Sequence, residues 1–238
     1  MRVCCALALG VILALAFPQM PATGAEPAPG DWPRFTRDLG GTRYSPLKQI
    51  NTRNVSRLTT AWSFRLRPEG GGAIVGGTTP IVVDGVLYMP LGTAIVALEA
   101  DTGKELWRQP VTGGISRRGV SWWPGDREHA PRIYYSNGRS LFALDAATGQ
   151  RVPGFGKNGE LDMGVPYNAP PTIYRDLLFV GANVAEMQVG PPGNTRAYDV
   201  RTGEKRWEFH TVPQPGEAGH ESWLNKGWKK RSDTNMWM

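Results

Sequence analysis

Histidine, cysteine and acidic side chains carry most catalytic and metal-binding chemistry, and in this chain of 238 residues they are scattered. His129, His210 and His220 are not spaced as ligands of one metal ion, and "HESW" does not complete a His-Glu-x-x-His motif. The run "GGGAIVGG" lacks the spacing of a dinucleotide-binding loop. Candidate site residues must therefore be sought at separated positions.

Arg118 in "SRRGVSWW" and Glu186 at the end of "GANVAE" are two such positions. A glutamate at the end of an inner strand could give oxygen ligands to a hard cation, but the loop-like sequence after it equally fits a solvated acid. Taken alone, Arg118 is most simply interpreted as a surface arginine paired with Asp126. The residues by themselves leave both interpretations open.

The first 25 residues have the organisation of a secretory signal peptide. Arg2 is followed by an apolar run over 4–17 and by small residues at 23–25, where a signal peptidase would cut. We expect residues 1–25 to be removed and the mature chain to be periplasmic, with an uncleaved membrane anchor as the alternative. The chain's two cysteines both lie in this segment, so the mature chain would have no disulfide and no covalently attached haem.

The net charge of +6 is spread along the chain and becomes +5 once Arg2 is removed, because the signal contains no acid. The longest basic cluster, "KGWKKRSD", fits a solvated loop better than a nucleic-acid site. We expect no nucleic-acid partner.

A Thr-Gly motif recurs three times and predicts the architecture. "ALEADTGKELW", "ALDAATGQRVP" and "AYDVRTGEKRW" place their glycines at 103, 149 and 203, and each copy follows a β-rich stretch with short strands. "IVVDGVLYM" in the first stretch predicts a hairpin that turns at Asp84-Gly85. Repeats of this length are typical of propeller blades, with a β-sandwich as the alternative.

Each motif is expected to form a tight turn, in which glycine takes positive φ and a side-chain oxygen caps turn amides. The tryptophan that ends the first and third copies would dock on the turn of the next blade. Pro153 stands at that position in the second copy, so the docking contact there is expected to be missing or altered.

Residues 31–238 resemble, in order, the pyrroloquinoline-quinone-dependent dehydrogenases of the glucose and alcohol type. The likeness is carried by "DWPRFTRDLGGTRYSPLKQI", "SRRGVSWWPGD", "YNAPPTIYRDLLFVGAN" and "EFHTVPQPGEAGHESW". It implies an all-β chain forming the N-terminal part, about three blades, of an eight-bladed quinoprotein β-propeller. The incomplete propeller domain would span 26–238, with an initial segment at 31–65 and repeat blades over 76–238.

The resemblance also implies the cofactors, pyrroloquinoline quinone and Ca²⁺. It assigns Arg118 to stabilising negative charge on the quinone oxygens, and Glu186 to the metal. The implied cofactor-binding residues are Arg118, Asn168, Asn183, Glu186 and Trp237, of which Trp237 would stack on the quinone ring. Without the resemblance, Asn168 is most simply interpreted as a turn residue before the prolines, and Trp237 as a tryptophan that packs in the propeller structure.

Three departures from the family pattern bear on function. Gly77 stands where the family commonly has a glutamate, and "GGISRRG" lacks the adjacent cysteines of many alcohol-oxidising members, which favours the glucose-type branch. The general base and a second metal ligand are expected beyond residue 238, so the chain alone should be inactive.

Two functions follow as hypotheses. The first is a periplasmic, possibly membrane-associated, dehydrogenase that oxidises a small sugar or alcohol and passes electrons to a membrane quinone or a cytochrome. The second, favoured by Gly77, is a non-catalytic propeller scaffold of the cell envelope.

Overall fold

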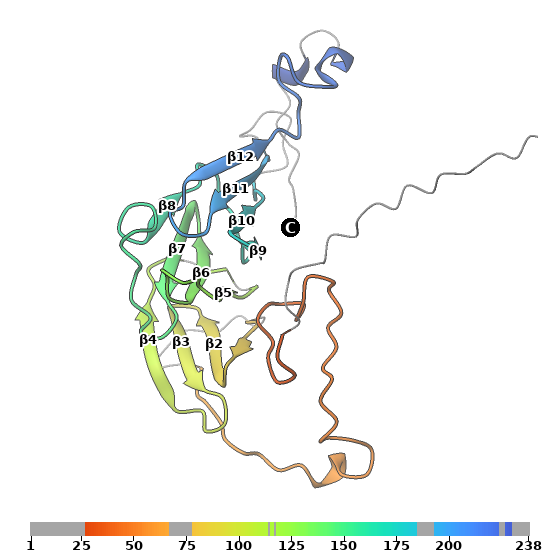
Figure 1. Cartoon of the computed structure of the whole chain (residues 1–238), viewed down its shortest axis with the longest axis vertical. Coiled ribbons are helices and arrows are strands. Elements are labelled where there is room, and N and C mark those ends of the chain that lie inside the picture. Colours follow the sequence, from red (N-terminus) through yellow and green to blue (C-terminus); the bar gives the residue numbers. More distant parts are fainter. Residues whose placement is uncertain are drawn as a thin grey trace, which may run out of the picture.

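The computed structural model describes residues 27–66, 78–113, 115–116, 118–184, 193–223 and 227–229. Within these ranges the chain forms three four-stranded antiparallel sheets, each built from strands that follow one another in sequence. The sheets lie side by side in an arc, with β4 and β8 toward its outer side and β5 and β9 toward its inner side (Figure 1). No helix in the described part of the chain is long and apolar enough to cross a membrane.

The strand bounds show how regular the repeat is. The first sheet contains β1 (Ile81–Val83), β2 (Val86–Leu91), β3 (Ala94–Glu99) and β4 (Glu105–Pro110). The second contains β5 (Ser121–Trp123), β6 (Arg132–Asn137), β7 (Ser140–Asp145) and β8 (Glu160–Asp162). The third contains β9 (Thr172–Tyr174), β10 (Leu177–Val180), β11 (Thr195–Asp199) and β12 (Lys205–Phe209). In the described part of the chain, two short 3₁₀ helices, η1 (Val55–Arg57) and η2 (His220–Ser222), lie outside the sheets.

The predicted hairpin is confirmed: β1 and β2 pair antiparallel from Ile81–Tyr88 to Val83–Val86, leaving Asp84 and Gly85 as the turn. Both turn residues have positive φ, 50° and 76°. This conformation matches the twist of the two strands, and aspartate followed by glycine is the pair that adopts it most readily.

The middle sheet is buried on both faces. Side chains alternate along its strands, so Ile133 and Tyr135 of β6 pack toward the first sheet while Tyr134 packs toward the third. In β7, Phe142 and Leu144 face the first sheet in the same way. Burial on both faces accounts for the nearly continuous apolar sequence of these strands.

The Thr-Gly turns form as predicted. Gly103, Gly149 and Gly203 have φ of 71°, 72° and 76°. In the second copy, Asp145 Oδ1 accepts hydrogen bonds from the amides of Ala147 and Thr148 at 3.0 and 2.8 Å. The side-chain oxygen thus satisfies turn amides that the sheet leaves unpaired.

An aromatic ring from the preceding segment covers each of these turns. Trp107 Nε1 donates to the Ala146 carbonyl at 2.9 Å, and a Cβ atom added at Gly149 would lie 2.5 Å from its ring. Trp62, which precedes the first sheet, makes the same contact with Ala100 and Gly103. Where Pro153 replaces the tryptophan, Phe155 covers Gly203 instead, so the docking contact is altered and not lost.

Asp126 forms a polar contact between the second and third sheets. Its Oδ2 lies 2.6 Å from Arg201 Nε and its Oδ1 lies 2.8 Å from His129 Nδ1. The Arg201 guanidinium also lies over the Trp123 ring, 5.6 Å from its centroid. The hydrogen bonds from His129 and Arg201 hold the pKa of the Asp126 carboxyl far below its usual range.

Replacing Gly149 should test the docking contact. We expect Gly149→Ala to lower the free energy of unfolding by about 3 kcal/mol, because the methyl group adds a clash with Trp107 to the strain of positive φ. Gly138→Ala is the matched control, since Gly138 also has positive φ (57°) but has open space around its Cβ position. It should cost about 1 kcal/mol, measured by denaturant titration. Equal losses in the two variants would contradict the docking role.

The Asp126 contact should make stability depend on pH in the acid range. Because the pKa of Asp126 is lower in the folded chain than in the unfolded chain, the unfolded chain binds the proton more tightly. The contact therefore stabilises the folded state above about pH 4, and this contribution is lost as the pH falls. The difference in thermal midpoint between wild type and Asp126→Asn should narrow as the pH drops from about 5 to about 2.5. Asp101→Asn, in an exposed turn of the first sheet, should follow the wild-type curve. A constant difference between wild type and Asp126→Asn would contradict the assignment.

Candidate functional site

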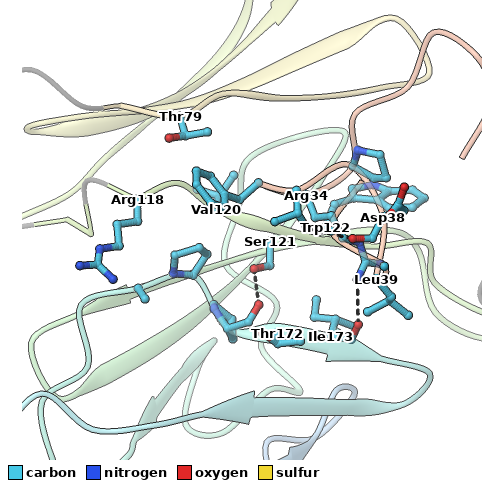
Figure 2. Close-up of a pocket in the computed structure, with 18 residues that line it drawn as sticks. Arg34, Asp38, Leu39, Thr79, Arg118, Val120, Ser121, Trp122, Thr172 and Ile173 are labelled. Atoms are coloured by element: carbon cyan, nitrogen blue, oxygen red, sulfur yellow. Dashed lines mark hydrogen bonds between the residues drawn. The ribbon is translucent and has the colours of Figure 1, made fainter. Parts of the chain in front are cut away.

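A cavity of about 710 Å³ lies on the inner side of the three sheets. Its walls come from four separate stretches of the chain: the N-terminal segment at 33–41, Thr79, the stretch 118–122 leading into β5, and the stretch 169–173 leading into β9. Arg118 lies at one end of the cavity, and Arg34, Asp38 and Leu39 lie at the other (Figure 2). Each sheet therefore contributes residues at or before its innermost strand.

The strap, residues 31–43, closes one side of this cavity. Trp32 exchanges two main-chain hydrogen bonds with Val82 of β1, at 2.7 and 3.0 Å. Arg34 Nη1 donates to the Ile173 carbonyl of β9 at 3.3 Å, a bond drawn in Figure 2. The strap thus ties the inner strand of the first sheet to that of the third.

The strap brings charged groups to the cavity. Arg34 is half-buried, and burial lowers its pKa, an effect that the charge of Asp38 opposes. Its Nε atom has no hydrogen-bond partner among the described residues. The Asp38 carboxylate accepts hydrogen bonds from the hydroxyl and amide of Thr42, which hold its pKa below the usual range. Sequence reasoning placed no site residue in this segment.

Arg118 lines the cavity and is exposed there. The predicted alternative of an ion pair with Asp126 is wrong, because the Asp126 carboxylate is bound by Arg201 and His129. The chain at Arg118 is confined on its C-terminal side. A Cβ atom added at Gly119 would lie 3.0 Å from the Thr79 carbonyl oxygen, so the stretch runs directly against the first sheet.

Asn168 lies beside Arg118 through a shared partner. The Ser116 hydroxyl donates to the Asn168 carbonyl at 2.6 Å and accepts from the Arg118 amide at 3.3 Å. Asn168 itself is exposed, and its neighbour Ala169 lines the cavity. Asn183 follows β10, and its amide donates to the Pro166 carbonyl at 2.7 Å, which places it next to the same segment.

Tyr167 is a site neighbour that sequence reasoning missed. Its side chain is 3% exposed, and burial raises the pKa of the phenol to about 12, against the opposing effects of the Gly181 main chain and the Arg118 charge. Its hydroxyl meets no described residue in hydrogen-bond geometry. A tyrosine before Asn-Ala-Pro-Pro is the only signal the sequence offered.

Glu186, Trp237 and Gly77 lie outside the described residues, so their predicted roles stay predictions. Within the described ranges, histidine, cysteine and acidic side chains form no cluster of three or more that could hold a metal ion.

Comparison with known proteins identifies the family to which this chain is similar. Residues 32–238 match the model of the PQQ-dependent glucose/ethanol/alcohol dehydrogenase β-propeller domain. The dehydrogenase subunit of the quinone-type alcohol dehydrogenase of Gluconobacter oxydans is 33% identical over 232 residues, covering 88% of this chain and 29% of that protein. The quinate/shikimate dehydrogenase (quinone) of Acinetobacter baylyi is 31% identical, covering 92% of this chain and 32% of its own length.

A solved structure agrees with these sequence matches. The quinohemoprotein alcohol dehydrogenase of Comamonas testosteroni superimposes with a TM-score of 0.65 at 30% identity, over 81% of this chain and 29% of that one. The chain spans about a third or less of the length of these relatives. The predicted all-β fold, a partial quinoprotein propeller, is confirmed, and the chain belongs to the PQQ-dependent glucose/ethanol/alcohol dehydrogenase β-propeller family.

Proposed function

We propose that this chain supplies one side of the pyrroloquinoline quinone site of a dehydrogenase that oxidises a hydroxyl group of a small sugar or alcohol. The observation that carries the proposal is the position of Arg118. It lines a cavity formed by the strap and by residues at or before the inner strands of three successive sheets, in a chain of the PQQ-dependent family. A cavity of this size, lined mostly by apolar groups with a few convergent polar ones, is suited to a small cofactor.

The donor groups at the cavity suit the chemistry of this cofactor, a flat tricarboxylate that needs cations and hydrogen-bond donors. Arg118 offers a planar guanidinium, which can donate two parallel hydrogen bonds to a carboxylate or quinone edge. Arg34 adds a second guanidinium, whose Nε has no partner among the described residues.

The bound quinone would supply the hydride acceptor for oxidation of the alcohol carbon. Arg118 would orient it and offset negative charge on its oxygens, through donors held in place before reaction. Asp38 is the acid that lines the cavity within the described residues, but its hydrogen bonds with Thr42 hold its pKa low and make it a weak base. We therefore assign the general base to none of the described residues.

Glu186 would bind Ca²⁺, Trp237 would stack on the quinone ring, and Asn168 and Asn183 would contact the cofactor. These roles rest on the sequence resemblance. Carboxylate oxygens are the ligands that calcium prefers. Secretion through residues 1–25 would deliver the protein to the periplasm, where a membrane quinone or a cytochrome would accept the electrons.

A second candidate function is a non-catalytic scaffold of the cell envelope. The observation in its favour is Gly77, which stands where the family commonly has a glutamate. A scaffold would fold without the cofactor and would bind no quinone, and this separates the two proposals experimentally.

The test uses protein produced from the complete gene and titrated with pyrroloquinoline quinone, with and without Ca²⁺. Tryptophan fluorescence would report binding, and dye reduction with glucose, ethanol and quinate would report activity. We expect binding by the wild type and an increase of the dissociation constant of about tenfold or more in Arg118→Ala, because charge-assisted hydrogen bonds are lost. Arg118→Lys should recover only part of the loss, since it cannot donate in a fork.

Arg139→Ala is the matched control. Arg139 pairs with Asp162 at an exposed position, and both side chains are more than half exposed. Arg139 is not among the residues that line the cavity, so its removal should leave quinone binding unchanged. It should also leave the fold intact, because exposed ion pairs contribute little to stability. A folded wild-type protein that binds no quinone under any of these conditions would overturn the dehydrogenase proposal in favour of the scaffold.

A further inference from the structure

The segment that leads into β9 has carbonyl groups but few amides to offer a neighbouring strand. Pro170 and Pro171 have no N–H, and a proline also holds the residue before it in an extended conformation. The segment therefore cannot join a regular ladder, and its carbonyls need donors from elsewhere.

Three serines supply these donors: Ser121 and Ser136 in the second sheet, and Ser116, whose amide donates to the Ser136 carbonyl at 3.2 Å. Ser116 donates to the Asn168 carbonyl at 2.6 Å and Ser136 donates to the Ala169 carbonyl at 3.0 Å. Ser121, at the start of β5, donates to the Pro171 carbonyl, the bond seen near the middle of Figure 2. All three serines are buried, with 4%, 0% and 7% exposure for Ser116, Ser136 and Ser121. The cavity wall of the third sheet is thus fastened to the second sheet by successive hydroxyl groups.

Ser116 differs from the other two serines in its second hydrogen bond. A hydroxyl group can donate once and accept as well. Ser116 Oγ donates to Asn168 and also accepts from the Arg118 amide at 3.3 Å. It joins the main chains of two residues predicted to contact the cofactor, one from each sheet.

The residue after Arg118 packs closely against Thr79, which precedes β1 of the first sheet. Gly119 has φ of 119°, and a Cβ atom there would lie 3.0 Å from the Thr79 carbonyl oxygen. Arg118 therefore stands between two constraints, the hydroxyl of Ser116 toward the third sheet and the close contact of Gly119 with the first. Loss of the Ser116 hydroxyl would release one of them.

We propose that Ser116 is a positioning residue, which sets the orientation of Arg118 relative to the Asn168 segment, residues 168–171 before β9. In this way it tunes the affinity of the cavity for its anionic cofactor. This rests on the proposed function, since the affinity concerned is that for pyrroloquinoline quinone. It predicts an effect on binding through Arg118 that Ser136 does not share, because Ser136 fastens the same segment without touching the Arg118 main chain.

The experiment is a double-mutant cycle in protein from the complete gene. Ser116→Ala and Ser136→Ala would each be made in the wild type and in the Arg118→Ala background. The dissociation constant for pyrroloquinoline quinone would be measured by fluorescence, and the thermal midpoint would be measured without cofactor. Ser136→Ala should lower the midpoint at least as much as Ser116→Ala, since it leaves the carbonyl of the buried residue Ala169 without its donor, whereas Asn168 is exposed.

The affinities should separate the two serines. We expect Ser116→Ala to weaken quinone binding about tenfold in the wild type and less than about twofold in the Arg118→Ala background, because a residue that acts through Arg118 is coupled to it. Ser136→Ala should have a smaller effect of equal size in both backgrounds. Ser116→Thr, which keeps the hydroxyl, should bind more tightly than Ser116→Ala.

The outcomes distinguish this inference from the proposed function. If the wild type binds no quinone, the proposed function fails and this inference fails with it. If the wild type binds, but the effect of Ser116→Ala is the same in both backgrounds or matches that of Ser136→Ala, then Ser116 is only structural and the proposed function stands. A threonine variant that folds with the wild-type midpoint, yet binds as weakly as the alanine variant, would also overturn the positioning role.

Discussion

The innermost strand of each sheet pairs with one neighbour only, and the rest of the structure depends on how its free edge is satisfied. An unpaired strand edge presents N–H and C=O groups that need partners or water. On the inner side of this chain, the strap pairs with β1 through Trp32, and it reaches β9 through Arg34. The hydroxyl groups of Ser116 and Ser121 donate hydrogen bonds to the Asn168 and Pro171 carbonyls, which precede β9. Local partners thus replace a further strand at these edges.

The same constraint explains why a cavity forms on this side. Side chains and a strap satisfy a strand edge at discrete points, whereas a paired strand would fill the space along it. The space left between these points is lined by the stretches that lead into the inner strands. Irregular stretches held by a rigid sheet are suited to carrying functional groups, because their backbone is free to present side chains while their ends are fixed. Arg118 and the Asn168 segment occupy such stretches.

Local rules predicted the repeating unit well and the contacts between units less well. Asp84-Gly85 and the Thr-Gly turns follow from residues adjacent in sequence, so their conformation could be inferred directly. Tryptophan docking was also predictable, because the motif places the ring at a fixed distance from the turn. Phe155 was not identified as the substitute in the second copy, since it lies two residues beyond the expected position and only the fold brings it to Gly203.

In the candidate site too, single residues were easier to predict than the contacts between them. Arg118 could be selected from the family resemblance, and the structure places it at the cavity. The partner of Asp126 could not be predicted, because Arg201 is 75 residues away in sequence and meets it only when two sheets stack. Arg34 and Ser116 were missed for a similar reason. Their roles depend on main-chain carbonyls of the third sheet, and the identity of a residue in the sequence gives no sign of which carbonyl it will meet.

A site assembled in this way links binding to the packing of the sheets. A ligand that contacts Arg118, the strap and the segment before β9 binds only when the three sheets are correctly stacked, so it stabilises that arrangement in proportion to its concentration and affinity. The aromatic contacts at Gly103, Gly149 and Gly203 fix the outer parts of the sheets, while the cavity lies at their inner edges. The inner edges are held by a few side-chain hydrogen bonds, such as those of Ser116 and Arg34. Ligand binding would therefore add stability where the apoprotein has the fewest regular strand pairings.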